Sequence, residues 1–419
     1  MVFGFGSYFF LVRYYEVSVF GIWTLFLVLT TASEMSRSAF IQNAFVKFFN
    51  ENKVNKDQLF TASLLLNLCS TVLFILILVL LIPFLSIFWK TELIQSLIYC
   101  YCITSIILIP FTQLNYLEQA NHRFSGVFWS NITRQGLFFF VVVICFVFFP
   151  DMSLIFFGWM QTVSALTGML VAYFLCKKYL PERLVLNWKL VRQLFRFGKY
   201  ILGTGFTSTI GKNADQVILG NVSHSSVAYY NAGVRILNLI EIPSLSISNI
   251  VYPKIAERAN LEGNSGAGKL YEKSVAIILA IILPAVAMVL LFPELVLLLT
   301  AGRKYLESAS VLRLMGTASL LIPFNIQIGS ALEVINRPHI SFYINLVSNI
   351  LNVVLNLILI PKYGATGAAI SFVATVLLIF IVGQYYVMQL LEVKLIRILG
   401  HIGTSYRTTF AFLTAKLKN

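Results

Sequence analysis

Apolar stretches long enough to cross a bilayer recur along almost the whole chain, separated by short polar connectors. A stretch of about 20 such residues predicts a transmembrane helix. Eleven stretches qualify, and residues 1–12 form a half-length twelfth. The eleven lie near residues 18–41, 60–89, 93–117, 125–149, 152–176, 197–220, 226–250, 273–300, 309–332, 339–360 and 365–390. The pattern predicts an all-α integral membrane protein of about 12 transmembrane helices, the first of them shortened.

One short motif occurs twice. "LIPF" opens residues 108–111 and again residues 321–324. Other pairs of positions recur at similar separations: Ser18–Val19 with Ser226–Val227, and Glu118 and Asn121 with Glu333 and Asn336. Chance similarity of apolar text is the alternative. A duplicated six-span unit explains the pairs better, and an even span number makes the two repeats parallel, with a solute path between them.

The repeat sets the expected domain boundaries. Residues 1–176 form an N-terminal six-helix lobe, and residues 197–391 form a C-terminal one. Residues 177–196 mix Leu and Trp with Lys and Arg, which is typical of an amphipathic linker along the cytoplasmic membrane surface. Residues 392–419 form a basic cytoplasmic tail. Span seven begins near residue 197, so by analogy we expect the chain to start in the middle of its first helix, through either a misassigned start or a real truncation.

Composition agrees with the membrane class, and the placement of charge gives the orientation. Hydrophobic residues make up 58% of the 419 positions and charged residues 11%, against about 25% charged in soluble domains. Most of the 31 Lys and Arg fall on one side of the spans. The positive-inside rule makes that side cytoplasmic, together with both termini. The net charge of +14 therefore reflects topology, and no nucleic-acid partner is expected.

Motifs for catalysis and for cofactors are missing from the sequence. The non-cytoplasmic loops are only a few residues long, and the four His are scattered. No Walker loop, metal-ligand spacing or Ser/His/Asp arrangement occurs. The five Cys lie in or beside apolar runs and are expected to be packed thiols. We therefore expect no enzyme, no metal site and no cofactor.

Polar residues inside the spans are the candidate site, because charges in a bilayer normally face a cavity or a partner. The candidates for a cationic, polar lumen that binds substrate are Arg37, Arg134, Lys212, Arg235, Arg313, Asn231, Asn238, Asn345, Asn349, Asn352 and Asn356. The acids Asp215, Glu34 and Glu241 are candidates for proton coupling. Arginine forks suit an anionic solute such as a phosphate or a carboxylate.

A structural role is the alternative for each of these groups. The Asn stripe suits interhelical hydrogen bonds as well as it suits a lumen. The spacing of three residues favours internal ion pairs for Glu34 with Arg37 and for Lys212 with Asp215. Arg134, Arg235 and Arg313, by contrast, have no acid within one helical turn, which favours the lumen.

The segment "NADQVILGNVSHSSVAYYNAGVRILNLIEIPSLSISNIVYPKIAE" at 213–257 resembles the polysaccharide transport proteins. "RYYEVSVFGIW" at 13–23, "RQLFRFGKYILG" at 192–203 and "PKYGATGAA" at 361–369 fit the same pattern. The resemblance is to the O-antigen flippases (Wzx-type) of the multidrug/oligosaccharidyl-lipid/polysaccharide exporter superfamily, and it covers nearly the whole chain. The short first span and the absence of further clear spans after residue 391 depart from the pattern.

The resemblance implies a two-lobed flippase of the bacterial inner membrane. Such a protein moves undecaprenyl-pyrophosphate-linked oligosaccharide, the repeat unit of O-antigen, capsule or exopolysaccharide, from the cytoplasmic to the periplasmic leaflet by alternating access. The partners that the resemblance implies are the lipid-linked oligosaccharide, membrane lipids, a polysaccharide polymerase and a chain-length regulator. The alternative is a proton- or sodium-coupled exporter of small molecules or drugs from the same superfamily. That class favours a cavity dominated by acids.

Overall fold

The computed structural model describes residues 2–50 and 54–416, and within these ranges every regular element is a helix. Side chains are described except at residues 39, 199–210, 212, 249, 253, 256, 260, 405 and 407–416. The chain divides into two compact units, Met1–Val227 and Ala228–Asn419. The all-α membrane architecture expected from the apolar pattern is confirmed.

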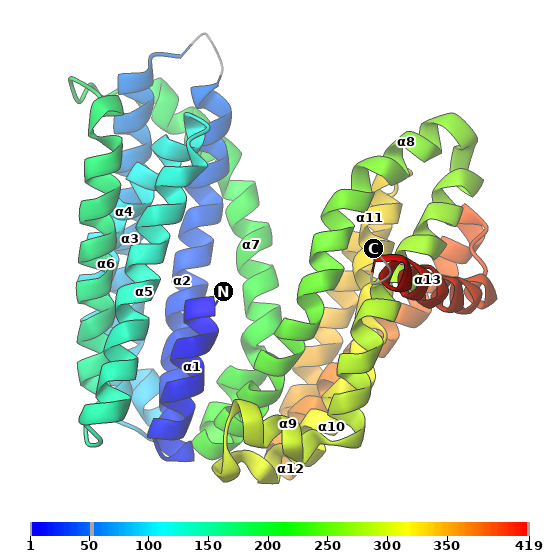
Figure 1. Cartoon of the computed structure of the whole chain (residues 1–419). Helices are drawn as coiled ribbons and strands as arrows, with labels where there is room; N and C mark the ends of the chain where they lie inside the picture. Colours follow the sequence, from blue (N-terminus) through cyan, green and yellow to red (C-terminus); the bar gives the residue numbers. More distant parts are fainter. Residues whose placement is uncertain (1, 51–53, 417–419) are drawn as a thin grey trace. The chain divides into compact units, whose positions relative to one another are not determined.

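Unit 1 is a bundle of long helices that run side by side (Figure 1). Its elements are α1 Val2–Tyr14, α2 Val17–Phe49, α3 Lys56–Phe88, α4 Leu93–Ala120, α5 Phe124–Phe148, α6 Leu154–Cys176, η1 Lys177–Tyr179 and α7 Trp188–Val222. The side-chain amide of Asn55 caps α3, the hydroxyl of Ser153 caps α6, and the amide of Asn187 caps α7, each by accepting from a backbone N–H of the first turn.

Unit 2 is built from two very long helices that each break at a glycine. Its elements are α8 His224–Leu291, which begins just before the boundary, α9 Pro293–Thr300, η2 Arg303–Ser308, α10 Ala309–Ser319, α11 Ile322–Val334, α12 Pro338–Leu391 and α13 Leu395–Lys416. Gly263 (φ 69°) interrupts α8, and Gly364 (φ 54°) interrupts α12. Glycine tolerates this left-handed backbone, so each long helix can turn over and contribute two spans (Figure 1).

Nine helical stretches of the described chain are long and apolar enough to cross a membrane. The stretches His224–Tyr252 and Leu261–Leu291 of α8 match two expected spans, and the two halves of α12 match two more. On α3, Leu80 and Ile87 are each 78% exposed. Lipid is as apolar as leucine, so these side chains suit a helix surrounded by hydrocarbon.

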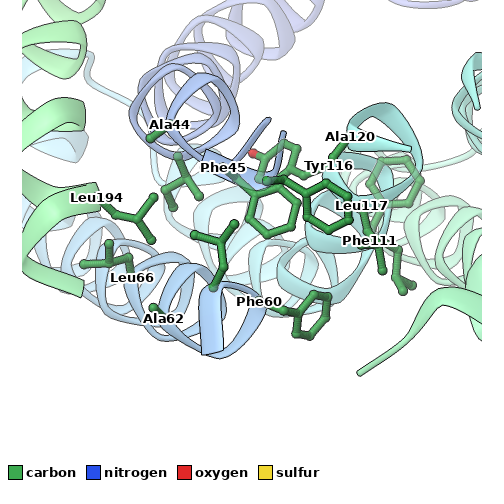
Figure 2. Packing of buried hydrophobic residues seen from close by; sticks show 14 of the residues in the cluster. Ala44, Phe45, Phe60, Ala62, Leu66, Phe111, Tyr116, Leu117, Ala120 and Leu194 are labelled. Carbon is green, nitrogen blue, oxygen red and sulfur yellow. The ribbon is translucent and has the colours of Figure 1, made fainter. Parts of the chain in front are cut away.

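The core of unit 1 joins α7 to α2, α3, α4 and α6. Phe45 of α2, Phe60 of α3, Leu117 of α4 and Leu194 of α7 belong to one buried cluster (Figure 2). The expected linker therefore ends in the first turns of α7, whose Leu194 is only 2% exposed. By packing, α7 belongs to unit 1. The division into six-helix repeats stays a prediction, because duplication and packing need not share a boundary.

A turn of the same geometry occurs once in each repeat, after α4 and after α11. The two turns correct part of the expected alignment of the repeats. α4 ends at left-handed His122 (φ 58°), and α11 ends at left-handed Asn336 (φ 57°). In both turns the next N–H donates five residues back, from Arg123 to Glu118 O at 2.9 Å and from Arg337 to Leu332 O at 2.8 Å. The equivalent of Glu118 is thus Leu332. The alignment of Glu118 with Glu333 is wrong by one residue, because it followed residue identity rather than the helix end.

The tail is helical and anchored to unit 2. The Glu272 carboxylate on α8 is 2% exposed and accepts from Lys394 N at 2.6 Å, one residue before α13. Arg397 Nη1 lies 3.8 Å from the same carboxylate. The Tyr406 hydroxyl donates to Ala280 O at 2.6 Å. A carboxylate at a helix N-terminus satisfies an unpaired N–H and favours the helix dipole.

Candidate functional site

A buried arginine occupies the interior of unit 1. Arg37 on α2 is 3% exposed. Its Nη1 donates to Thr71 Oγ1 on α3 at 3.0 Å and to Ser105 O on α4 at 3.3 Å. Its Nε and Nη2 find no hydrogen-bond partner among the described residues. A buried cation held only by neutral oxygens retains most of its attraction for an anion.

A glutamate and a second arginine meet on the neighbouring helices. Arg134 Nη2 on α5 donates to both carboxylate oxygens of Glu34 on α2, at 3.2 and 3.3 Å. The Arg134 side chain is 25% exposed and that of Glu34 is 30% exposed. The expected local pair of Glu34 with Arg37 is therefore replaced by a pair between helices. Arg134 has no acid near it in sequence, yet it has one in space.

Several residues that shape this cluster were missed by sequence reasoning. The Arg134 guanidinium lies 5.4 Å from the Phe111 ring centre, and Phe111 closes the repeated "LIPF" motif. A Cβ on Gly168 of α6 would come within 2.9 Å of Arg134 Cβ, so this glycine makes room for α5. Thr71 and Ser105 are uncharged, so the search for charged residues inside the spans does not find them. We name Glu34, Arg37 and Arg134 with these neighbours the α2–α5 cluster.

The candidates on α8 and α10 lie in unit 2. Arg313 Nη2 lies 3.4 Å from Glu294 Oε1, and both side chains are about half exposed (53% and 55%). Asn231 is 5% exposed, Arg235 and Glu241 are partly buried, and Asn238 is exposed. Arg313 therefore has an acid partner on α9, beyond the one-turn window of the sequence argument.

The asparagine stripe on α12 serves two purposes. Asn352 Nδ2 donates to Thr375 Oγ1 at 3.2 Å, and Asn356 Nδ2 donates to Asn352 Oδ1 at 2.9 Å. These bonds join the two halves of α12, as expected of interhelical hydrogen bonds. Asn349 is partly buried. Asn345 is exposed and lines a cavity of about 210 Å³ together with Asn325.

The remaining coupling candidate is Asp215 on α7. It is 7% exposed, and its Oδ1 accepts from Gln216 N at 2.7 Å. The side chain of Lys212 lies outside the described residues, so the pairing of Lys212 with Asp215 stays a prediction. Within the described chain no cluster of three or more His, Cys, Asp or Glu has metal-binding geometry.

A second buried acid lies at the cytoplasmic end expected for α4. Glu118 is 2% exposed, and neither carboxylate oxygen has a hydrogen-bond partner in the described structure. Arg123 Nε lies 3.7 Å from Oε2, which is an ion pair but too long for a hydrogen bond. The Arg123 guanidinium also stacks 4.8 Å from the Tyr179 ring. This group ties the start of α5 to η1, which follows α6.

Comparison with protein family models identifies the family of this chain. The family model described as "Polysaccharide biosynthesis protein" matches residues 10–310, well over half of the chain. The chain belongs to this family. Proteins similar in sequence include a probable low-salt glycan biosynthesis flippase, Agl15, of Haloferax volcanii. It is 21% identical over 50% of this chain and 44% of that protein. A putative O-antigen transporter of Shigella flexneri is 27% identical over 46% of each chain.

Solved structures give the fold of this family member. A multidrug resistance MATE family transporter of the MOP superfamily, in an inward-facing conformation, matches with a TM-score of 0.77, at 16% identity, over 93% of this chain and 94% of that chain. The lipid II flippase MurJ in an inward closed conformation matches with a TM-score of 0.73, at 15% identity, over 99% of this chain and 90% of that chain. The fold is therefore that of MOP superfamily transporters. The related proteins named here are transporters and flippases rather than enzymes. The matched segments span less than half the length of the curated relatives.

Proposed function

We propose that this family member is a flippase for undecaprenyl-pyrophosphate-linked oligosaccharide, the repeat unit of O-antigen, capsule or exopolysaccharide. Transport runs from the cytoplasmic to the periplasmic leaflet by alternating access. The observation that carries the proposal is Arg37, a buried guanidinium in a polysaccharide-biosynthesis family member of MOP fold, two of whose donors have no partner among the described residues. A membrane protein keeps such a charge where a function requires it.

The chemistry of the cargo fits the polar groups on the page. A glycan cannot enter hydrocarbon alone, because each unpaired hydroxyl is costly to bury. Amide and hydroxyl side chains replace water around the sugar, whereas Arg134 holds the pyrophosphate by charge-assisted hydrogen bonds and Arg37 supplies the second cation of the α2–α5 cluster. The other proposed substrate-binding residues, each taken within its own unit, are Lys212, Asn231, Arg235, Asn238, Arg313 and Asn349. The polyprenyl tail stays in the bilayer.

Location and partners follow from the same proposal. The excess of Lys and Arg on one side makes both termini cytoplasmic in a bacterial inner membrane. The product on the periplasmic face is the substrate of a polysaccharide polymerase, so a polymerase and a chain-length regulator are the proposed protein partners. The probable low-salt glycan biosynthesis flippase among the relatives supports a cargo that contains a glycan.

An exporter of small molecules or drugs is the second candidate, coupled to protons or sodium. The TM-score of 0.77 to a MATE family transporter favours it. Glu34, Asp215 and Glu241 are its coupling candidates. In unit 1, however, Glu34 is already paired with Arg134. The α2–α5 cluster then contains two cations and one acid, which suits an anion better than a cationic drug.

The deciding experiment measures the leaflet distribution of lipid-linked oligosaccharide in cells depleted of this protein. Accumulation on the cytoplasmic leaflet with loss of surface glycan is the expected result. Re-expressed Arg37→Ala should leave the accumulation in place, whereas the exposed control Arg192→Ala should clear it. A normal distribution with intact surface glycan after depletion would exclude the flippase and leave small-solute export.

A further inference from the structure

Glu34 occupies the position from which an anionic ligand would bind Arg134. We propose that Glu34 is an internal competitor: it holds Arg134 while the protein is empty, and the pyrophosphate of the cargo displaces it onto Arg37. This inference rests on the proposed function, and it adds a gating role for an acid within the site.

The first argument is the geometry of the ion pair. Both Glu34 oxygens share the single Arg134 Nη2, at 3.2 and 3.3 Å. Two oxygens on one guanidinium nitrogen occupy less of the fork than the parallel two-nitrogen arrangement that carboxylates and phosphates prefer. A phosphate can therefore make a better contact with Arg134 than Glu34 makes, and exchange of one anion for the other is favourable.

The second argument is access. The paired side chains are 25% and 30% exposed, so an anion that enters the site can reach both. Ion pairs exposed to this degree contribute little net free energy, and breaking them costs little. Arg37, by contrast, is 3% exposed and cannot be approached first. Arg134 is thus the entry point for the anion.

The third argument is that displaced Glu34 has somewhere to go. Residues three apart on a helix are neighbours on its surface, so Glu34 and Arg37 lie on the same side of α2. Arg37 has two donors, Nε and Nη2, without a partner in the described structure. When Glu34 moves to Arg37, the number of ion pairs in the cluster rises from one to two, with phosphate on Arg134 and carboxylate on Arg37. The exchange leaves no buried carboxylate unpaired.

The test measures binding of inorganic pyrophosphate to the purified full chain by isothermal titration calorimetry. Glu34→Gln removes the competing charge, so its affinity for pyrophosphate should rise about two- to five-fold over wild type. The exposed Glu333→Gln makes the same charge change elsewhere and should bind as wild type does. Arg37→Gln removes the donors to which displaced Glu34 would bind, and its affinity for pyrophosphate should fall.

Unchanged or weaker binding by Glu34→Gln overturns the inference, as does an equal gain in Glu333→Gln. Thermal midpoints in detergent verify that each variant is folded. If Glu34→Gln fails to fold, Glu34→Asp replaces it, because the shorter side chain weakens the hold on Arg134 and should also raise the affinity. A normal leaflet distribution in depleted cells rejects the flippase whatever the calorimetry shows, whereas accumulation with unchanged Glu34→Gln binding rejects only the competitor role.

Discussion

The α2–α5 cluster of unit 1 and the α12 seam of unit 2 bury polar groups in different ways. The cluster relies on charge: beside the pair of Glu34 with Arg134, Arg37 has two donors that find no partner in the part of the chain that the structure describes. The seam relies on amides and hydroxyls, with Asn356 bonded to Asn352 and Asn352 to Thr375. An amide is buried at modest cost, whereas an unpaired charge is expensive. The seam therefore suits holding helices together, and the cluster suits binding.

The same contrast occurs at the turn that the two repeats share. Glu118 in the first repeat is 2% exposed, and its equivalent Leu332 in the second is 0% exposed. Both turns contain the same backbone hydrogen bond, in which the N–H of Arg123 or Arg337 donates to the carbonyl of Glu118 or Leu332. The carboxylate is therefore unnecessary for the turn. Exchanging the two residues tests how each unit tolerates charge.

The largest effect is expected for Leu332→Glu. This variant places a carboxylate in a fully buried site of unit 2 and should cost about 3–5 kcal/mol of stability, because the charge has no partner. We expect loss of monodisperse protein after extraction and a strongly lowered thermal midpoint. The exposed neighbour Glu333→Leu is the control and should change the midpoint little. A wild-type midpoint in Leu332→Glu would mean that unit 2 tolerates charge as unit 1 does.

The next effect concerns transport, and it separates two arginines. Arg37→Ala removes a buried anion partner and should lower lipid-linked oligosaccharide flipping at least about tenfold. Arg313→Ala removes an arginine that is 53% exposed and already paired with Glu294, so its loss should be smaller. Leaflet assays at matched protein levels compare the two. Equal losses of flipping would show that transport depends on Arg313 as strongly as on Arg37.

A smaller effect is expected in the α12 seam. Asn356→Ala removes the donor to Asn352 and should destabilise the protein by about 1–2 kcal/mol, within the range of interhelical hydrogen bonds. Flipping by the folded protein should remain near wild type. Asn345→Ala, at an exposed position, is the matched control for the midpoint. A transport defect in Asn356→Ala with an unchanged midpoint would move the seam from structure to function.

The sequence predicts these features unevenly, for physical reasons. Span class and duplication follow from periodicity, because apolar length and helix ends are local properties. Ion pairs between helices are not local: Glu34 meets Arg134 across 100 positions, so the local spacing to Arg37 gave the wrong partner. Glu118 was matched to Glu333 by residue type, although the left-handed residues His122 and Asn336 set the register. The arginines of the cluster were found by charge alone, whereas Thr71 and Ser105 became visible only in the packing.

The smallest effect is expected for Glu118→Leu, which gives unit 1 the residue of unit 2. The change removes two buried carboxylate oxygens that lack hydrogen-bond partners, and it costs one ion pair with Arg123 at 3.7 Å. Replacing a buried ion pair by a hydrophobic residue is often neutral or stabilising. Arg123 is 37% exposed at its side chain and keeps its stacking on Tyr179, so it is not left as a buried charge. We therefore expect a thermal midpoint equal to or slightly above wild type.

Glu118→Gln completes this test, because it keeps the shape of the side chain and removes only the charge. If Glu118→Gln is stable but Glu118→Leu is not, packing at the turn rather than charge decides the outcome. If both variants are destabilised, the ion pair with Arg123 supports the α4–α5 turn. In that case unit 1 uses buried charge for structure as well as for binding. Stable variants with normal flipping would confine the functional charges of the α4–α5 region to the α2–α5 cluster, whose Arg134 lies nearly three helical turns into α5.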